Sequence, residues 1–157
     1  MKNFSEYSVE SAMDFIEAWE GCRLTAYKCP AGIWTIGYGH TGGVREGQRI
    51  TEEEALDLLV EDLRAHAERL APKVKVQVAD GQYIALLSLA FNVGVGAVAK
   101  STLLRLLNAG DIEAAGDEFL KWTYAAGREL PGLVRRRREE RKLFLEGARC
   151  SISSGLP

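Results

Sequence analysis

A long amphipathic segment between Thr51 and Pro72 constrains the fold of this chain more than any other part of the sequence. It opens on Thr51-Glu52-Glu53-Glu54, a capping box whose side chains satisfy free backbone N–H groups at a helix start. An apolar stripe at helical spacing follows, formed by Leu56, Leu59, Val60, Leu63 and Leu70. Pro72 marks the end, because proline interrupts the hydrogen-bond pattern of a helix. A helix of this length is predicted to act as a spine that joins two lobes.

The region before this helix changes its pattern part-way. Residues 8–20 have helical spacing, with Ser8 as the predicted N-cap, Gly21 as the stop and an apolar face of Ala12, Ile16 and Trp19. Between residues 24 and 49, six glycines separate short β-prone pieces such as Ile33-Trp34-Thr35-Ile36. This part is predicted to form a small antiparallel sheet.

The remainder of the chain is predicted to be helical. Helix starts are expected at Asp80, Ser101, Asp111 and Pro131. The last helix is expected to close at Gly147, and the tail at 151–157 is expected to fray.

This order of elements predicts one α+β domain over residues 1–157, built from two lobes. The core is expected at about 8–147, with a β-rich lobe at about 22–50 and a helical lobe at about 72–147. The apolar fraction of 46% is ordinary for a globular protein of this size. The junction between the lobes is the expected place for a cleft.

Charge and hydropathy narrow the range of functions. The net charge of −2 argues against a dedicated nucleic-acid-binding protein. No apolar run reaches the length of about eighteen residues that a membrane-spanning helix requires. The amino terminus lacks the apolar block of a secretory signal. We therefore expect either a protein kept in the cytoplasm or one whose export segment is missing from this sequence.

The charge is unevenly distributed along the chain. From Arg128 to Arg149 there are eight Arg or Lys and four Glu residues, a net of +4, which leaves −6 for residues 1–127. A basic carboxy-terminal element suits an anionic polymer such as a cell wall. A solvated helix face with its own ion pairs explains the same pattern. Because the run from Arg135 to Arg138 covers every direction around a helix, at least one of these arginines is expected to point inward.

The chain has three cysteines, Cys22, Cys29 and Cys150, which cannot all pair within one chain. Cys22 and Cys29 are seven residues apart. This spacing is compatible with a disulfide between them and also with two separate reduced thiols.

The most specific motif lies between Glu20 and His40. Glu20 is followed by eight residues and Cys29, then by five residues and Thr35, and Gly37-Tyr38-Gly39-His40 closes the motif. The segment resembles the endolysins of glycoside hydrolase family 24, the phage-type lysozymes. In that family an Asp, or less often a Cys, stands at the position of Cys29.

Two later segments resemble the same family. Ala90-Phe91-Asn92-Val93-Gly94, followed by Ser101-Thr102-Leu103-Leu104, is similar to its helical-lobe motif. Gly132-Leu133-Val134, followed by Arg136-Arg137 and Glu140, is similar to its carboxy-terminal motif. The resemblance covers about residues 8–147 and implies a lysozyme-like fold. It also implies a muramidase that hydrolyses the β-1,4 bond between N-acetylmuramic acid and N-acetylglucosamine in peptidoglycan, causing lysis of the host cell.

Hydrolysis of a glycosidic bond needs a proton for the leaving oxygen and a group that acts on the opposite face of the sugar. The resemblance implies that Glu20 is the proton donor. The negative end of the preceding helix favours a protonated carboxyl group, whereas a neighbouring arginine favours the carboxylate. The sequence leaves this balance open.

Cys29 is the departure from the common pattern, and the resemblance implies that it fills the role of the Asp. A thiol with a pKa of about 8.5 is mostly neutral at pH 7 unless its surroundings favour the thiolate, which Arg23 or Lys28 could do. Whether Cys29 is a base, holds a water or is a nucleophile stays open. Attack by the thiolate would change the stereochemical outcome from inversion to retention. Thr35 is expected to orient the water through its hydroxyl group, although a packing role in a strand is the alternative.

Cys22 adds a redox hypothesis. In an oxidising compartment a Cys22–Cys29 disulfide would lock the catalytic thiol, and reduction or exchange would release it. Cys150 would then be an exchange partner or simply a free thiol.

The remaining candidate residues are assigned from the two later motifs. Asn92 could hydrogen-bond an N-acetyl group, while Phe91 is expected to belong mainly to the core. Arg136 and Arg137 match the arginine pair of the family, and one of them is expected to reach Glu20.

Two histidines offer other interpretations. A Cys29–His40 pair could serve a wall peptidase or amidase, and Cys22, Cys29 and His40 could bind zinc, but neither spacing matches a known pattern. We expect His40 to brace the sheet against an acidic residue of the long helix, and His66 to be exposed on that helix.

We therefore expect a monomeric lysozyme that needs no metal or organic cofactor and acts on peptidoglycan glycan strands, without binding nucleic acid or inserting stably in a membrane. Release from the host cytoplasm to the periplasmic wall is expected to depend on a holin-type partner or on an amino-terminal export segment. A non-catalytic binding module that uses the arginine helix, and an inactive lysozyme fold, are the alternatives.

Overall fold

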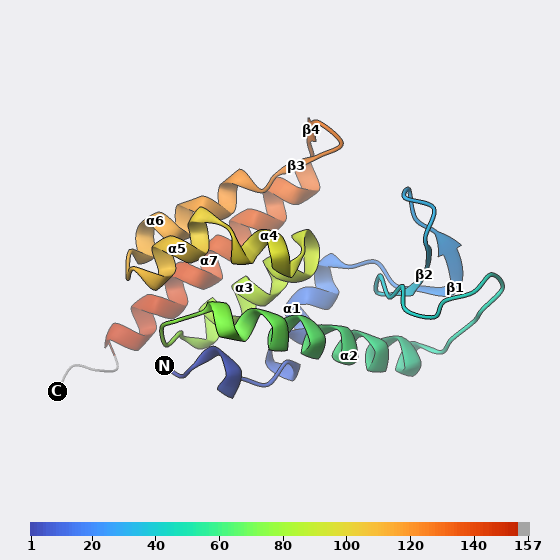
Figure 1. Cartoon of the computed structure of the whole chain (residues 1–157), viewed down its shortest axis with the longest axis horizontal. Coiled ribbons are helices and arrows are strands. Elements are labelled where there is room, and N and C mark those ends of the chain that lie inside the picture. The colour runs from blue at the N-terminus through green and yellow to red at the C-terminus, as the bar shows by residue number, and fades with distance from the viewer. Residues whose placement is uncertain (154–157) are drawn as a thin grey trace.

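The computed structural model describes residues 1–153, and the side chains of residues 1–149. The described chain is an α+β domain, as predicted, with a small sheet at one end of a long helix and a helical lobe at the other (Figure 1). The helices are α1 (Glu10–Trp19), α2 (Glu52–Leu70), α3 (Asp80–Val93), α4 (Val95–Ala99), α5 (Thr102–Asn108), α6 (Ile112–Glu118) and α7 (Pro131–Ser153). The strands are β1 (Arg23–Lys28), β2 (Trp34–Gly37), β3 (Tyr124–Ala125) and β4 (Arg128–Glu129), and 3-10 turns lie at Phe4–Glu6, Ala71–Lys73 and Phe119–Lys121.

Helix α2 is the predicted spine. Its start is fixed by the predicted capping box, in which the Thr51 hydroxyl accepts from the Glu54 N–H at 3.1 Å and the Glu54 carboxylate accepts from the Thr51 N–H at 3.4 Å. The helix ends at Leu70, and Pro72 lies in the 3-10 turn that follows. The α2 helix contacts β2 on one side and α3 and α4 on the other, so it connects the two lobes.

The β lobe is a hairpin of β1 and β2. The strands are antiparallel, with Tyr27 opposite Thr35 and a bulge between Arg23 and Tyr27. Most of its side chains are exposed, but Ile36 is fully buried and Gly37 packs against Ala55 of α2. This contact anchors the sheet on the spine.

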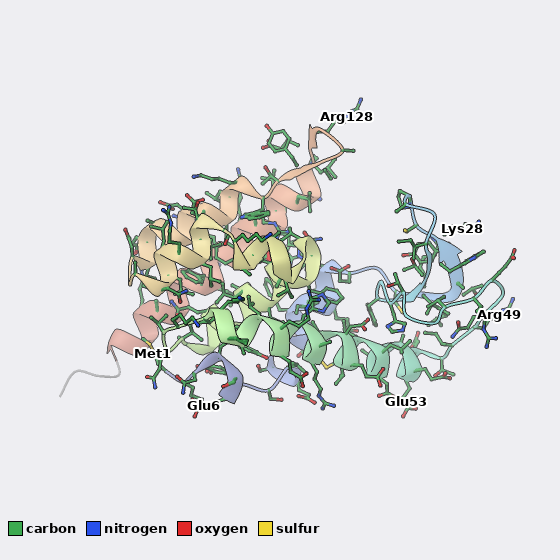
Figure 2. The ribbon with its side chains drawn as sticks, viewed as in Figure 1. Met1, Glu6, Lys28, Arg49, Glu53 and Arg128 are labelled. Carbon is green, nitrogen blue, oxygen red and sulfur yellow. The ribbon has the colours of Figure 1, made fainter. Side chains whose placement is uncertain are left out.

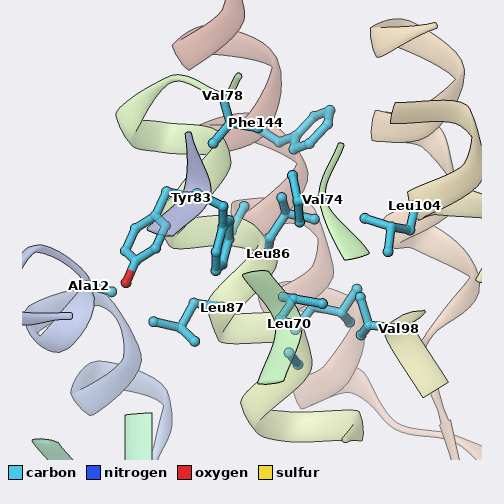
Figure 3. Close-up of a cluster of buried hydrophobic side chains, with 14 of the residues drawn as sticks. Ala12, Leu70, Val74, Val78, Tyr83, Leu86, Leu87, Val98, Leu104 and Phe144 are labelled. Carbon is cyan, nitrogen blue, oxygen red and sulfur yellow. The ribbon is translucent and has the colours of Figure 1, made fainter. Parts of the chain in front are cut away.

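The helical lobe is built around α3, which is buried along most of its length. Figure 3 shows Tyr83, Leu86 and Leu87 of α3 in the core, with Phe144 of α7 and Leu70 at the end of α2 nearby. The α3 and α7 helices form the largest helix–helix contact of the described chain. This contact fixes the side chains that α7 presents to the end of α1.

A pair of glycines explains one wrong prediction. We expected the last helix to stop at Gly147, but α7 continues to Ser153. A Cβ atom on Gly147 would lie 3.1 Å from the Gly81 Cα, and one on Gly81 would lie 2.4 Å from the Leu143 carbonyl oxygen. Gly147 therefore permits the close approach of α3 and α7 rather than ending the helix. Of the tail expected to fray, residues 151–153 are helical, and 154–157 lie outside the described residues.

Other predicted boundaries are close to those observed. Ser101 and Asp111 cap α5 and α6, accepting from Leu104 N–H at 3.1 Å and Ala114 N–H at 3.3 Å. The α1 N-cap is Val9 rather than Ser8, whose hydroxyl bonds to the Glu10 carboxylate.

The sequence prediction missed α4 and the β3–β4 hairpin. The turn of this hairpin holds Ala126 at φ 52° and Gly127 at φ 77°. Figure 2 shows Arg128 at the end of this hairpin, and Lys28 and Arg49 on the β lobe. Within residues 1–153, no helix is long and apolar enough to cross a membrane.

Candidate active site

Glu20 lies where α1 ends. Its backbone is extended, and its N–H donates to the carbonyl groups of Ile16 at 3.1 Å and Glu17 at 3.3 Å, which closes the last turn of the helix. The carboxylate oxygen Oε1 lies 2.6 Å from Nη1 of Arg136, and the side chain is 22% exposed. Glu20 therefore combines the negative end of a helix with a direct ion pair, the two opposing effects expected from the sequence.

Arg136 is the arginine that reaches Glu20. It is buried, and its Nη2 donates to both the carbonyl oxygen and the hydroxyl oxygen of Ser88 at 3.2 Å. The guanidinium group thus joins the end of α1 to α3 and α7. Arg136 therefore presents a buried positive charge directly to Glu20.

Arg137 has a different role. It is fully buried, its Nε donates to the carbonyl oxygen of Trp122 at 2.9 Å, and its other nitrogens donate to Glu140 and to the Asn92 side-chain oxygen. The bond from Arg137 orients the Asn92 side chain, whose amide N–H groups have the donor character needed to bind an N-acetyl carbonyl group. Arg137 ties α7 to the residues beside the site without contacting Glu20.

Glu140 completes the buried arginine cluster, defined here as Arg136, Arg137 and Glu140. Burial raises the pKa of Glu140 to about 7, against the opposing charges of Arg137 and Arg136. Burial also lowers the pKa of Arg137. The motif spacing alone indicated no role for Glu140, although its i+3 and i+4 spacing from the two arginines is the usual spacing of helical ion pairs.

A pocket of about 460 Å³ lies beside Glu20 at the junction of the lobes. This junction pocket is lined by Glu20, Tyr38, Gly39, His40, Thr41, Gly42, Asp62, His66, Phe91 and Asn92. A second pocket of about 420 Å³ shares Asn92 and reaches the β3–β4 hairpin, which the sequence prediction missed. The expected position of the cleft agrees with the junction pocket.

His40 braces the pocket wall as predicted. Its Nδ1 lies 2.9 Å from the Asp62 carboxylate on α2, and its Nε2 lies 2.9 Å from the Gly42 carbonyl oxygen. Both ring nitrogens are occupied, so His40 has none available for a peptidase pair with Cys29. Among the described residues, no group of three or more His, Cys, Asp or Glu side chains could hold a metal ion.

Phe91 and His66 line the pocket together. Their rings are 5.2 Å apart, and both side chains are half-buried. Phe91 packs against the hydrophobic core as expected and also faces the pocket. The prediction that His66 is simply exposed was wrong, because it packs on Phe91 and its Nδ1 lies 2.6 Å from the Asp62 carbonyl oxygen.

Cys29 and Thr35 lie side by side on the β hairpin. The backbone N–H of Ile33 lowers the pKa of Cys29 most, and the Ala31 N–H adds to this. Thr35 is almost fully buried, and its hydroxyl donates to the Ile33 carbonyl oxygen at 2.9 Å. Neither residue lines the junction pocket, and neither hydrogen-bonds to Glu20 in the described structure.

The basic residues expected to activate Cys29 are engaged elsewhere. Arg23 lies over the Tyr27 ring at 4.2 Å, and Lys28 lies over the Trp34 ring at 5.3 Å. Neither contributes to the lowered pKa of Cys29, which comes from hydrogen bonds.

Of the two arrangements that the cysteine spacing left open, the structure shows two separate thiols. Cys22 and Cys29 are both free and flank opposite ends of β1. Seven residue steps along a strand span about 20 Å, whereas the Cα atoms of a disulfide lie about 4.4–6.8 Å apart. Cys22 lies instead near the Tyr38 hydroxyl, which donates to Glu17 at 3.0 Å. A Cys22–Cys29 bond, and the redox lock that depends on it, is incompatible with β1 as folded here. The side chain of Cys150 lies outside the described residues.

Comparisons with known proteins agree with the fold. The family model for phage lysozyme matches residues 17–140, which is most of the chain. The chain belongs to the phage lysozyme family. It is 45% identical over 139 residues to an endolysin of Acyrthosiphon pisum secondary endosymbiont phage 1, covering 86% of this chain and 95% of that protein.

Two further relatives are informative. A SAR-endolysin of Enterobacteria phage P21 is 42% identical over 129 residues, covering 82% of this chain and 78% of that protein. The solved muramidase domain of SpmX from Asticaccaulis excentricus is 38% identical with a TM-score of 0.81, covering 86% of this chain and 95% of that chain. This lysozyme is therefore a glycoside hydrolase of the endolysin type that acts on peptidoglycan.

Proposed function

We propose that this lysozyme hydrolyses the β-1,4 bond between N-acetylmuramic acid and N-acetylglucosamine and thereby lyses the host cell. The observation that carries the proposal is the position of Glu20. It opens into the junction pocket while its carboxylate pairs with the buried Arg136. A carboxyl group so placed can deliver a proton to the oxygen of a bond lying across the pocket.

Glu20 and Arg136 act in sequence in this proposal. Glu20 donates its proton to the leaving oxygen as the bond breaks, and this leaves a carboxylate. Arg136, 2.6 Å away, stabilises the negative charge that forms. The strength of this ion pair therefore affects how readily the charge forms on Glu20 as the bond breaks.

Cys29 is proposed to act as the base that activates the attacking water, the role that the family resemblance implies for an Asp at this position. Backbone N–H groups lower its pKa, so a larger fraction of the thiol is ionised near neutral pH. Thr35 gives its hydroxyl hydrogen to Ile33 and keeps its lone pairs free. It can therefore orient a water by accepting a hydrogen bond from it.

Asn92 and Phe91 are proposed to bind the sugar. Asn92 has amide N–H groups that can donate, and its oxygen accepts from Arg137. Phe91 offers an apolar face within the same pocket. We expect the amide to bind an N-acetyl carbonyl group and the ring to contact the sugar face.

We propose that the enzyme works as a monomer, binds no nucleic acid, and reaches the periplasmic wall from the host cytoplasm. A holin-type partner that opens the membrane is the proposed route. An export segment is the alternative, since a similar protein is a SAR-endolysin. Expression in a host with and without a holin tests this: lysis that needs the holin supports the first route, and lysis without it supports the second.

A turbidity assay on purified peptidoglycan tests the catalytic assignment. Glu20→Gln is expected to lower the rate by at least about 10²-fold, because proton transfer is lost. Cys29→Asp is expected to stay active and Cys29→Ser to lose activity, while the exposed Glu139→Gln serves as the control. New reducing ends, without new amino groups, are expected among the products. Unchanged lysis by Glu20→Gln would overturn the assignment.

The anomeric form of the product separates the roles of Cys29. If water attacks directly, the β bond gives an α reducing end first, as inversion requires. If the thiolate attacks, a covalent intermediate forms and the β form appears first. Proton NMR during the first minutes of digestion reads the outcome.

A further inference from the structure

Arg136 lies between two carboxylates. Its Nη1 is 2.6 Å from Glu20 Oε1, and its Nε is 4.0 Å from Glu140 Oε2. Both Arg136 Nε and Glu140 Oε2 are buried and have no hydrogen-bond partner within the described structure. An unpaired buried donor thus faces an unpaired buried acceptor just beyond hydrogen-bond distance, an arrangement that native proteins rarely leave without a role.

We propose that Glu140 is a positioning residue, which competes with Glu20 for Arg136 and so limits how strongly Arg136 holds Glu20 in its charged form. The inference rests on the proposed role of Glu20 as proton donor. A small shift of Arg136 would close the bond from Nε to Glu140 Oε2 and lengthen the bond from Nη1 to Glu20. Glu20 could then regain the proton that it must donate in the next cycle.

Glu20 and Glu140 compete for Arg136 rather than for Arg137, because the guanidinium group of Arg137 already donates to other partners. Arg137 donates to Trp122, Asn92 and the other Glu140 oxygen, so it has little freedom to respond. From α3, the neutral Ser88 hydroxyl is near enough to Glu140 to lower its pKa, although Oε2 of Glu140 makes no hydrogen bond within the described structure.

Two charged side chains beside this cluster form ion pairs of their own. Arg141 pairs with Asp117 of α6 at 2.7 Å, and Lys121 of the following turn pairs with Glu118 at 2.5 Å. The local charge near Glu20 therefore depends on Glu140. When Glu140 is ionised, the two positive charges of the arginines balance the two negative charges of Glu20 and Glu140. With Glu140 neutral, one positive charge is left over, and it favours the Glu20 carboxylate.

The protonation state of Glu140 changes within the working range of pH. Its pKa of about 7 means that the side chain is mostly neutral near pH 5.5 and mostly ionised near pH 8.5. Glu140 thus supports the protonated form of Glu20 at high pH, where that form is scarce. The expected consequence is an activity profile that extends further to alkaline pH than Glu20 alone would allow.

The pH–rate profile of Glu140→Gln, compared with Glu139→Gln, tests the proposal. The introduced amide resembles neutral Glu140 at every pH, so kcat is expected to match wild type below about pH 6. Above about pH 8 the alkaline limb of the Glu140→Gln variant is expected to lie roughly one pH unit lower, the size expected for two like charges separated by one guanidinium group. KM is expected to change little. Glu139→Gln on the exposed face of α7 is expected to reproduce the wild-type profile.

A merely structural role for Glu140 predicts a different result. The variant would then lose activity by the same factor at every pH, and this outcome, or an unchanged profile, overturns the proposal. Glu140→Asp keeps the charge and is expected to recover part of the alkaline limb.

A measurement without activity keeps the inference separate from the proposed function. Carbon-13 NMR of the Glu20 carboxyl group in the wild-type enzyme is expected to show a second inflection near pH 7, from ionisation of Glu140. The inflection is expected to be absent in Glu140→Gln. A single inflection in the wild type overturns the coupling even if Glu140→Gln fails to fold. If Glu20→Gln retains lysis, the catalytic assignment fails, whereas this titration still tests the competition for Arg136.

Discussion

At the scale of single residues, four adjacent arginines have unequal roles. Arg136 and Arg137 are buried, whereas Arg135 and Arg138 are exposed on the same helix. Successive positions on a helix differ in direction by about 100°, so the sequence predicts that some of the four point inward but not which. The packing of α7 on α3 decides this, through contacts between residues distant in the sequence.

Replacement of Arg137, one of the two buried arginines, is expected to destabilise the folded protein. Arg137→Met leaves the Glu140 charge and the Asn92 oxygen without their partner, so we expect a loss of about 3–5 kcal/mol in the free energy of unfolding. Arg138→Met, on the exposed face, is expected to change it by no more than about 0.5 kcal/mol. Urea unfolding at pH 8, followed by circular dichroism, measures both. Equal effects of the two substitutions would contradict the buried network.

Glu140 also makes stability depend on pH. Its carboxyl pKa is raised from 4.5 to about 7 in the folded state, so the folded protein binds the extra proton between these values. Glu140 therefore makes its full contribution to the free energy of unfolding below about pH 4.5. This contribution, at most about 3 kcal/mol, is lost as the pH rises to about 7. Urea midpoints measured from pH 5 to pH 8 are expected to fall less steeply for Glu140→Gln than for wild type. Parallel curves for the two proteins would show that Glu140 titrates normally.

The two hairpin cysteines give a redox prediction. Because Cys22 and Cys29 are held at opposite ends of β1, dithiothreitol is expected to leave the lytic rate unchanged. Cys22→Ser is expected to behave as the wild type under the same conditions. Activation by the reductant that Cys22→Ser abolishes would mean that β1 opens enough to form the disulfide.

Motif spacing predicted part of the site and failed on the rest for an identifiable reason. Glu20, Cys29 and Thr35 lie within one short segment, where the order of residues carries the information. Ser88 and Glu140 come from α3 and α7, and only the packing of those helices brings them to Arg136. The sequence could not predict this proximity, because it depends on how the helical lobe folds.

At the scale of elements, the contact between α3 and α7 has the tightest geometry in the described chain. Spacing and caps predicted α2, α5 and α6 well, because their signals are local. Gly147 was misread as a helix stop, because a glycine selected for close packing looks the same in the sequence as one selected for a turn.

Gly81→Ala tests this close approach. The added Cβ would lie 2.4 Å from the Leu143 carbonyl oxygen, a backbone atom that cannot move alone. We expect a loss of roughly 1–3 kcal/mol in the free energy of unfolding, with a shifted Glu20–Arg136 pair and a lower lytic rate. Gly96→Ala in α4 has nothing within 4 Å of its Cβ and is expected to be neutral or slightly stabilising. Thermal unfolding and turbidity assays of both variants provide the comparison.

At the scale of the whole molecule, the structure shows a second basic surface besides the carboxy-terminal helix. Much of the basic carboxy-terminal helix is neutralised internally or paired, as Arg141 is with Asp117 and Arg149 is with Glu113. A concave surface of about 690 Å³ instead gathers four basic side chains without an acidic residue in its lining, namely Lys73, Lys75, Lys100 and Arg105. None of the four has an ion pair within the described structure.

This basic concavity is braced by Asn108, which accepts from the Lys75 N–H at 2.8 Å and donates to the Lys73 carbonyl oxygen at 2.9 Å. The segment after α2 is thereby held against α5. Because its charges are unpaired and converge on one hollow, we expect this surface to contribute more to attraction for an anionic wall than the exposed arginines of α7 do.

A pair of double variants with equal change in charge decides between the two surfaces. Lys73→Gln with Lys75→Gln is expected to reduce co-sedimentation with purified cell walls at about 50 mM salt by several-fold. Arg135→Gln with Arg138→Gln is expected to reduce it less. The difference is expected to vanish at about 500 mM salt, where screening acts over only a few ångströms. Cleavage of short soluble glycan fragments is expected to be unchanged in both, because neither surface lines the junction pocket. A larger loss of wall binding in the arginine double variant would show instead that α7 is the main wall-binding surface, as the distribution of charge along the sequence suggests.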